Sequence, residues 1–212
     1  LLSALAAHAQ AYPTKPITLV VPFAAGGPTD VVARTVGALL SRQLGQTVVV
    51  ENKVGAGGTV ASAYVAKAAP DGYTLLLHHN GMSTAPALYR KMSFNPLTDF
   101  EYVSQVVDVP MTLLGRKDLP ANTLPELLAW LKANPGKANL ANAGLGAVSH
   151  LCGMLFQKAA GTEVTTVPFS GTAPAMNALL GGQVDILCDQ TTQTTPHIKA
   201  GTVKLYGVTT LN

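Results

Sequence analysis

The chain has 212 residues, of which 48% are hydrophobic and 12% are charged, and its formal net charge is +3. Ordinary soluble domains carry about 25% charged residues, so this apolar composition excludes a disordered chain. The positive charges are spread without clusters, so the basic patch of a nucleic-acid-binding protein is missing, no nucleic-acid partner is expected, and an anionic ligand is mildly favoured.

The first eleven residues predict the back half of a secretory signal peptide. Residues 1–5 are mostly apolar, and Ala9-Gln10-Ala11 fits an A-x-A cleavage site before Tyr12. The alternative is the first turn of an ordinary helix rich in Ala and Leu. We expect residues 1–11 to be a signal-peptide remnant and the protein to be exported to the periplasm of a Gram-negative bacterium. No later stretch reaches the roughly 20 apolar residues that a membrane-spanning helix needs.

Residues 12–109 predict a first α/β domain. Its strands are expected at 17–21, 47–51 and 73–77, and its helices between a cap at Thr29 or Asp30 and Gly45, and over 59–68. This β-α-β-α-β order implies a parallel sheet with right-handed crossovers. A short helix at 84–89 and an extended segment at 100–107 are expected to follow.

Residues 110–204 restart the pattern and predict a second α/β domain. Its strands are expected at 111–116, 139–143, 164–169, 184–188 and 203–208, and its helices at 124–132, 150–160, 174–181 and 194–200. A chain that crosses between two such units through strands forms a hinge. The last strand has nothing after it to pack on. We therefore expect residues 205–212 to return toward the first domain, and that domain to lack a C-terminal part.

The first strand-to-helix loop, residues 22–30, is the leading candidate for a binding site. Ligands of open α/β sheets bind at the carboxyl ends of parallel strands, and a helix N-terminus there favours an anion. Phe23 could add an apolar wall. Asp30 would repel an anion, so it is expected to cap the helix or to act through water. The alternative is a tight turn with no ligand.

Three loops of the second domain could face this one. Residues 144–149 repeat the small-residue pattern before a helix, and two facing anion sites would clamp a dicarboxylate. Residues 169–172 and 188–192 are candidates for further walls. Cys152 and Cys188 lie in the same predicted domain, so they could form a disulfide in an oxidising compartment or remain two buried thiols.

Other motifs predict no catalysis and no metal. Residues 55–58 are rich in glycine but do not match G-x-G-x-x-G, and no P-loop lysine follows. His78 and His79 would point in opposite directions on a strand, and His150 and His197 have no carboxylate or cysteine at metal spacing. No G-x-S-x-G elbow is present. We expect no cofactor. The alternative of another class is an α/β enzyme whose glycine loops bind phosphate.

Several blocks together resemble the Bug family, the periplasmic substrate-binding proteins of tripartite tricarboxylate transporters. The resemblance runs from about residue 12 to residue 210. It rests on residues 22–30 (PFAAGGPTD), 51–58 (ENKVGAGG), 66–76 (AKAAPDGYTLL), 149–151 (SHL), 171–176 (GTAPAM) and 179–185 (LLGGQVD).

The resemblance implies a two-domain Venus-flytrap fold of the type II periplasmic kind, with parallel-sheet domains joined by a strand hinge. It implies a monomer, not an enzyme, that captures a small carboxylate, either a dicarboxylate or an aromatic acid, for transporter subunits that it meets transiently. A carboxylate receptor feeding a sensor kinase is the related alternative. Family members hold the carboxylate through backbone groups and ordered water.

Residues 78–80 and 188–192 depart from the family's pattern and would face the distal end of the ligand. The residues expected to contact the ligand are Phe23, Ala24, Ala25, Gly26, Gly27, Thr29, Asp30, His79, Asn80, Gly144, Leu145, Gly146, Ala147, Ser149, His150, Phe169, Asp189 and Gln190.

Overall fold

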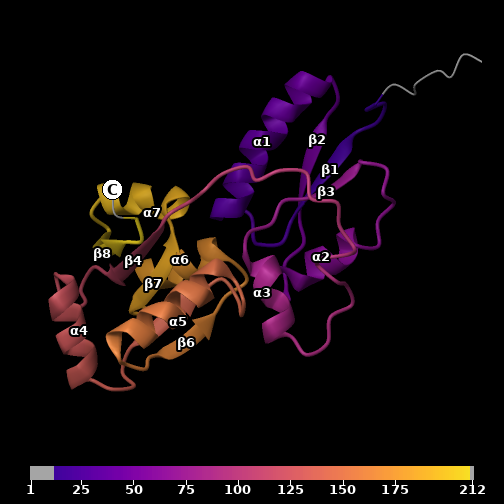
Figure 1. Cartoon of the computed structure of the whole chain (residues 1–212). Coiled ribbons are helices and arrows are strands. Elements are labelled where there is room, and N and C mark those ends of the chain that lie inside the picture. Colours follow the sequence, from indigo (N-terminus) through magenta and orange to yellow (C-terminus); the bar gives the residue numbers. More distant parts are fainter. Residues whose placement is uncertain (1–11, 211–212) are drawn as a thin grey trace, which may run out of the picture.

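The computed structural model describes residues 12–210, which form two α/β units side by side (Figure 1). The predicted signal-peptide remnant, residues 1–11, lies outside the described residues. Within the described part, no helix is long and apolar enough to cross a membrane. A single segment without regular secondary structure, residues 101–110, carries the chain from the first unit to the second, where an extended segment was predicted for residues 100–107.

The first unit holds a three-stranded parallel sheet in the order β2-β1-β3. Leu19 and Val21 of β1 face Ala33 of α1, and the other face of the sheet carries α2. The elements are β1 (Ile17–Val21), α1 (Pro28–Leu44), β2 (Val48–Asn52), a 3-10 turn (Ala56–Gly58), α2 (Thr59–Val65), β3 (Thr74–Leu76) and α3 (Gly81–Leu88).

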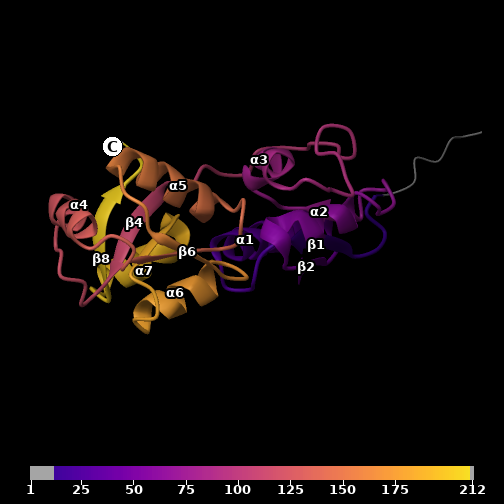
Figure 2. The same ribbon diagram turned by 90° about the horizontal axis from the view of Figure 1, so that it is seen from below.

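The second unit holds a five-stranded sheet in the order β6-β5-β7-β4-β8. Figure 2 shows its helices distributed over both sides of that sheet. The elements are β4 (Met111–Arg116), α4 (Leu124–Ala133), β5 (Asn139–Asn142), α5 (Val148–Ala160), β6 (Thr165–Pro168), α6 (Thr172–Leu180), β7 (Ile186–Gln190), α7 (Thr191–Lys199) and β8 (Val203–Val208).

Alternating strand residues explain how the second unit has a core on each face. Leu187 of β7 packs with Met176 and Leu179 of α6, whereas its neighbour Ile186 packs with Leu127 of α4 on the opposite face. Successive strand residues point to opposite faces, so an almost continuous apolar strand is needed when helices cover both. Each fully buried Leu or Met contributes about 1.5–3 kcal/mol.

One prediction about the second unit is wrong. Its sheet is mixed rather than parallel, because β4 pairs antiparallel with both β7 and β8. β8 runs antiparallel to β4, and its last residue, Val208, pairs with Thr112 near the start of β4. The return of residues 205–212 toward the first domain stays a prediction. β4 lies inside the sheet, between β7 and β8, and local sequence patterns do not reveal this position.

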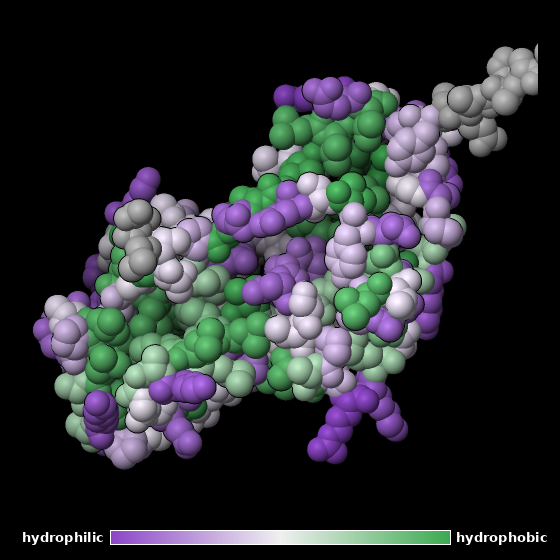
Figure 3. Space-filling view, in the orientation of Figure 1, coloured by the Kyte–Doolittle hydropathy of each residue, from purple (hydrophilic) through white to green (hydrophobic). Residues whose placement is uncertain are grey.

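Apolar side chains remain on the surface of the first unit. Figure 3 shows them gathered over the region of α1 and β2, where Leu39 is 55% exposed and Val49 is 48% exposed. The same view shows polar residues near the junction of the two units.

Candidate functional site

The loop after β1 ends in an uncapped helix N-terminus. Gly27 is the N-cap of α1, with extended backbone angles, and Pro28 occupies the first helical position. The predicted cap at Thr29 or Asp30 is therefore wrong, because proline favours that first position and starts the helix earlier. No side chain of the described residues caps the helix, so the N–H groups of its first turn stay available to an anion.

The Asp30 side chain holds this loop in place through hydrogen bonds. Its carboxylate is buried and accepts hydrogen bonds from the Gly26 amide at 2.9 Å, from Arg34 at 2.9 and 3.0 Å, and from Asn52 at 3.0 Å. Burial disfavours its ionised form, but the hydrogen bonds from Arg34, Gly26 and Asn52 outweigh burial and lower the pKa of Asp30. Because these hydrogen bonds occupy its oxygens, Asp30 stabilises the loop and does not itself contact an anion.

Phe23 of the first loop packs against two histidines that follow β3. The ring of His79 stacks on Phe23 with centroids 4.7 Å apart, and the Gly81 amide donates to its Nδ1 atom at 2.9 Å. Burial lowers the pKa of His78 to about 4, and burial together with His78 lowers the pKa of His79 well below its usual value. Both rings are therefore neutral at pH 7. Asn80 is exposed and precedes α3 without capping it.

Side chains of the second unit fix the facing loop, residues 143–147. Ser149 accepts a hydrogen bond from the Ala143 amide at 2.8 Å, and His150 accepts one from Gly146 at 3.2 Å. The N-cap of α5 is Ala147, so Ser149 lies inside the helix, and its hydroxyl stabilises the loop. Gly144 and Gly146 both have positive φ, which glycine adopts without strain.

The loops of the two units touch across the cleft. The Tyr89 hydroxyl at the end of α3 donates to the Leu145 carbonyl at 2.6 Å. Gly57 lies against the same carbonyl, since a Cβ atom built on Gly57 would stand only 1.8 Å from that oxygen. At the other side of the cleft, a Cβ atom on Gly171 would lie 2.9 Å from the Ala24 amide nitrogen. The structure is therefore a closed arrangement of the two units.

A cavity of about 300 Å³ lies where these loops meet, within the usual range for small-ligand sites. Four predicted residues line it, whereas the 55–58 segment and Tyr89 were not predicted to be part of a site. The sequence feature that could have indicated this segment as part of the site is that residues 55–58 follow the carboxyl end of β2. The lining residues are Pro22, Phe23, Gly55, Ala56, Gly57, Gly58, Tyr89, Ala143, Gly144, Leu145, Pro168, Phe169 and Ser170. A larger depression of about 490 Å³ beside Leu131 and Gly161 holds none of the predicted residues.

A second uncapped helix N-terminus faces the first one. Gly171 is the N-cap of α6 and offers no side chain, and Thr172 begins the helix. A Cβ atom built on Gly27 would lie 3.8 Å from the Thr172 Cβ, so the starts of α1 and α6 are neighbours across the cleft. Two positive helix ends that converge in this way favour a bound anion.

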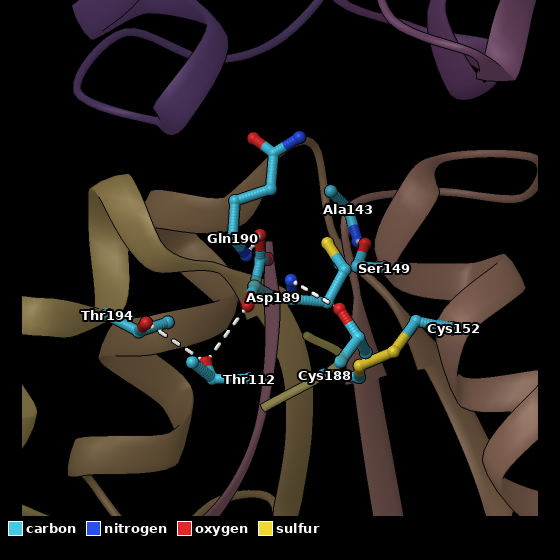
Figure 4. The surroundings of a disulfide bond; sticks show 10 residues. Thr112, Ala143, Ser149, Cys152, Cys188, Asp189, Gln190 and Thr194 are labelled. Atoms are coloured by element: carbon cyan, nitrogen blue, oxygen red, sulfur yellow. Dashed lines mark hydrogen bonds between the residues drawn. A yellow bond between two sulfur atoms is a disulfide. The ribbon is translucent and has the colours of Figure 1, made fainter. Parts of the chain in front are cut away.

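Asp189 and Gln190 end β7 beneath this meeting point. Figure 4 shows the Gln190 side chain extending toward the first unit, with Asp189 below it. Asp189 is 2% exposed, its Oδ1 atom accepts from the Gln190 amide at 2.7 Å, and its Oδ2 atom has no partner among the described residues. Burial raises the pKa of Asp189 to about 7, although the neighbouring Thr172 hydroxyl and the Gln190 amide oppose this rise.

The two cysteines form a disulfide next to the site (Figure 4). Cys152 of α5 and Cys188 of β7 have Cα atoms 6.0 Å apart, within the usual range for a disulfide. The structure thus favours the predicted disulfide over the alternative of two free thiols. The bond ties α5, which begins beside the 143–147 loop, to the residue before Asp189.

The structure places the predicted residues in two groups. Phe23, Gly144, Leu145 and Phe169 line the cavity, while Gly27, Asp189 and Gln190 lie near the facing helix starts. Ala25 and Gly26 are exposed on the first loop. Within residues 12–210, no group of three or more His, Cys, Asp or Glu side chains could hold a metal ion.

Comparison with known proteins gives matches over nearly the whole chain. Residues 32–212 match the family described as "Tripartite tricarboxylate transporter family receptor". A curated UPF0065 protein of Agrobacterium vitis is 52% identical over 199 residues, which cover 94% of this chain and 58% of that protein. This chain therefore spans less than two thirds of that relative.

Three solved structures extend the comparison. The periplasmic binding protein BugD has a TM-score of 0.92 and 56% identity, covering 95% of this chain and 67% of BugD. MatC from Rhodopseudomonas palustris, with bound malate, has a TM-score of 0.90 and 42% identity over 95% of this chain and 69% of MatC. Another R. palustris protein, with adipate, has a TM-score of 0.91 and 37% identity over 95% of this chain and 68% of that protein.

Proposed function

The chain belongs to the tripartite tricarboxylate transporter receptor family, and from this premise we propose that it captures a small dicarboxylate between its two units and delivers it to the membrane subunits of such a transporter. The fold is that of a two-domain binding protein, and the protein is not an enzyme, because the family is one of receptors. The family points to an extracytoplasmic location.

One observation carries the ligand class: the uncapped starts of α1 and α6 face each other across the cleft. Their first-turn N–H groups can hold a carboxylate without a basic side chain, because each helix end carries about half a positive charge. The adjoining cavity of about 300 Å³ has room for the rest of a short dicarboxylate. The malate and adipate bound to relatives support this class.

Closure would trap the ligand by contacts between loops. In an open state the two units would separate about the segment of residues 101–110, and a carboxylate could reach the start of α1. Closing would then bring α6 against the ligand and form the hydrogen bond from Tyr89 to Leu145. A membrane subunit would recognise the closed pair of units as the loaded form.

A ligand screen by calorimetry and thermal unfolding tests the proposal. L-malate, succinate and adipate should raise the melting temperature, since a ligand that binds only the folded state stabilises it by mass action. A nucleotide should have no effect. The proposal fails if no dicarboxylate stabilises the protein, and stabilisation by a nucleotide alone would favour the phosphate-binding alternative.

The variant Gly27→Val, measured in the same screen, tests whether the first loop is the carboxylate site. The Gly27 backbone, with φ −80°, accepts a side chain, but a Cβ atom there would lie 3.3 Å from the Ala24 carbonyl and 3.8 Å from Thr172. The added methyl groups should therefore block the ligand and abolish binding. Gly207→Val in β8 is the matched control, because a Cβ atom at Gly207 meets nothing within 4 Å. Unchanged affinity in Gly27→Val would exclude this loop as the carboxylate site.

A further inference from the structure

We propose that His79 is a positioning residue of the closed arrangement: its unprotonated Nδ1 atom fixes the start of α3, and α3 in turn holds residues 145–146 of the facing loop. The inference goes beyond the proposed function, because it concerns the contact between the two units and not the ligand. The residues that line the cavity do not include His79, so it acts through its neighbours.

The start of α3 takes its cap from His79. Asn80 is the N-cap residue, but its side chain makes no capping hydrogen bond. The first N–H groups of a helix have no partner within the helix and need one elsewhere. Here the Gly81 amide donates to His79 Nδ1 at 2.9 Å, and the Met82 amide donates to the His79 carbonyl at 3.1 Å. His79 therefore satisfies two of these groups from the position before the N-cap.

The hydrogen bond from Gly81 assigns the tautomer of the His79 ring. A nitrogen that accepts from an amide carries no proton, so the single proton of the neutral ring lies on Nε2. Burial and the neighbouring His78 hold the pKa of His79 well below its usual value. Among the described residues, no Asp or Glu forms an ion pair with either ring. The acceptor is therefore present throughout the neutral pH range.

The two histidines join three segments of the first unit. The His79 ring stacks on Phe23, which lines the cavity, with centroids 4.7 Å apart. The His78 ring meets the His79 ring edge to face at 4.9 Å. His78 also lies against the 55–58 segment, since a Cβ atom built on Gly58 would stand 2.6 Å from its Nε2 atom. The first loop, the 55–58 segment and the start of α3 thus share one support.

α3 meets the second unit through residues at both of its ends. A Cβ atom built on Gly81 would lie 2.7 Å from the Gly146 carbonyl oxygen, so the helix start packs directly on the facing loop. From the helix end, Leu88 would lie 3.1 Å from a Cβ atom on Gly146, and the Tyr89 hydroxyl donates to the Leu145 carbonyl at 2.6 Å. A short helix moves as a unit, so a shift of its start disturbs all of these contacts.

The contact carries no charge on either side. In the second unit, His150 Nδ1 accepts from the Gly146 amide at 3.2 Å, and burial lowers the pKa of His150. Burial raises the pKa of Tyr89, so this phenol is also uncharged at pH 7. A neutral imidazole therefore holds a glycine amide on each side of the meeting point of Gly81 and Gly146. Shape and hydrogen-bond direction set this contact, and no ion pair there would compensate for a lost acceptor.

The variants His79→Leu and His79→Asn form a matched pair that tests the inference. The two new side chains have nearly the same shape and both lose the ring, but only Asn offers an oxygen where Nδ1 stood. Amide hydrogen exchange of the intact protein without ligand should become about fivefold faster in His79→Leu, both at the start of α3 and in residues 143–147. In His79→Asn both segments should stay within about twofold of the wild type. His197→Leu, in the last turn of α7, is the control and should change neither segment.

Two further measurements accompany the exchange experiment. Calorimetry with L-malate, succinate and adipate should show that whichever of them binds the wild type binds His79→Leu about fivefold more weakly, and His79→Asn within about twofold, because the ligand is held by the closed arrangement. Nuclear magnetic resonance of the ¹⁵N-labelled histidine rings of the wild type should show the His79 proton on Nε2 at pH 7. This second measurement needs no variant.

The outcomes separate this inference from a purely local role and from the proposed function. If His79→Leu speeds exchange in α3 alone, His79 is only a helix cap and the inference is wrong. If His79→Asn behaves like His79→Leu, the ring and not its acceptor matters, and the inference is also wrong. A proton on Nδ1 in the wild type would overturn it even if His79→Leu does not fold. If none of the three ligands binds, the proposed function fails, while the exchange rates still decide the role of His79.

Discussion

Gly57→Ala tests whether the closed contact between the two units is needed for binding. A Cβ atom at this position would stand 1.8 Å from the Leu145 carbonyl oxygen, whereas real Cβ contacts essentially never fall below 3.0 Å. The two units would have to separate by about 1 Å at this point, which also stretches the 2.6 Å hydrogen bond between Tyr89 and Leu145 beyond a useful length. Losing that bond alone costs about 1 kcal/mol, so the dissociation constant should rise at least fivefold.

The same substitution also strains the backbone, and a second variant separates the two effects. Gly57 has φ +62°, where a side chain costs roughly 1–2 kcal/mol. Gly136→Ala imposes similar strain at φ +72°, with nothing within 4 Å of the new Cβ atom. Thermal unfolding without ligand should therefore show similar losses in both variants, while calorimetry with the best dicarboxylate shows weaker binding only in Gly57→Ala. Equal affinities for the two variants would refute the reasoning.

Two further predictions concern stability. Asp30→Asn should lower the free energy of unfolding by about 2 kcal/mol at pH 7, because it weakens the buried hydrogen bonds that hold the first loop. The pKa of Asp30 is depressed in the folded state, so its contribution is fully present above the unfolded pKa of about 4 and is lost as the pH falls through the folded pKa. Urea unfolding at pH 7 and pH 3 should show the difference between wild type and variant shrinking, and a constant difference would contradict this assignment. Cys152→Ser opens a loop whose ends are 36 residues apart, so unfolding without reductant should become easier by about 4 kcal/mol. Dithiothreitol should remove the difference from wild type, and a variant as stable as the oxidised protein would exclude the disulfide.

Local sequence patterns were sufficient to predict most elements and the first loop. The alternation of apolar strands with capped or glycine-ended helices predicted nearly every helix and strand within a few residues, because hydrophobic periodicity and glycine act over short distances. The same patterns placed Phe23, Gly144 and Phe169 at strand ends, where the structure has them lining the cavity.

Contacts between distant residues could not be predicted in the same way. Asp30 and Arg34 are one helical turn apart and visible as a pair, but nothing local indicates that Asn52 completes the set of hydrogen bonds around Asp30. Tyr89 appeared only as the end of a short helix, because its partner, Leu145, lies in the other unit. Such contacts depend on how the two units meet, and a single sequence carries no direct signal for this.

The position of β4 between β7 and β8 has a consequence for the order in which the second unit folds. Met111 pairs with Gln190, and Arg116 pairs with Val203, so the first strand of this unit finds its neighbours only among the last strands. Sequence-distant pairings of this kind slow folding, because a long loop must close before any contact compensates for the lost entropy. Refolding of this unit should therefore be limited by the docking of β7 and β8 on β4. A chain that ends before Val203 would expose one whole side of β4, with its unpaired backbone groups, to other molecules.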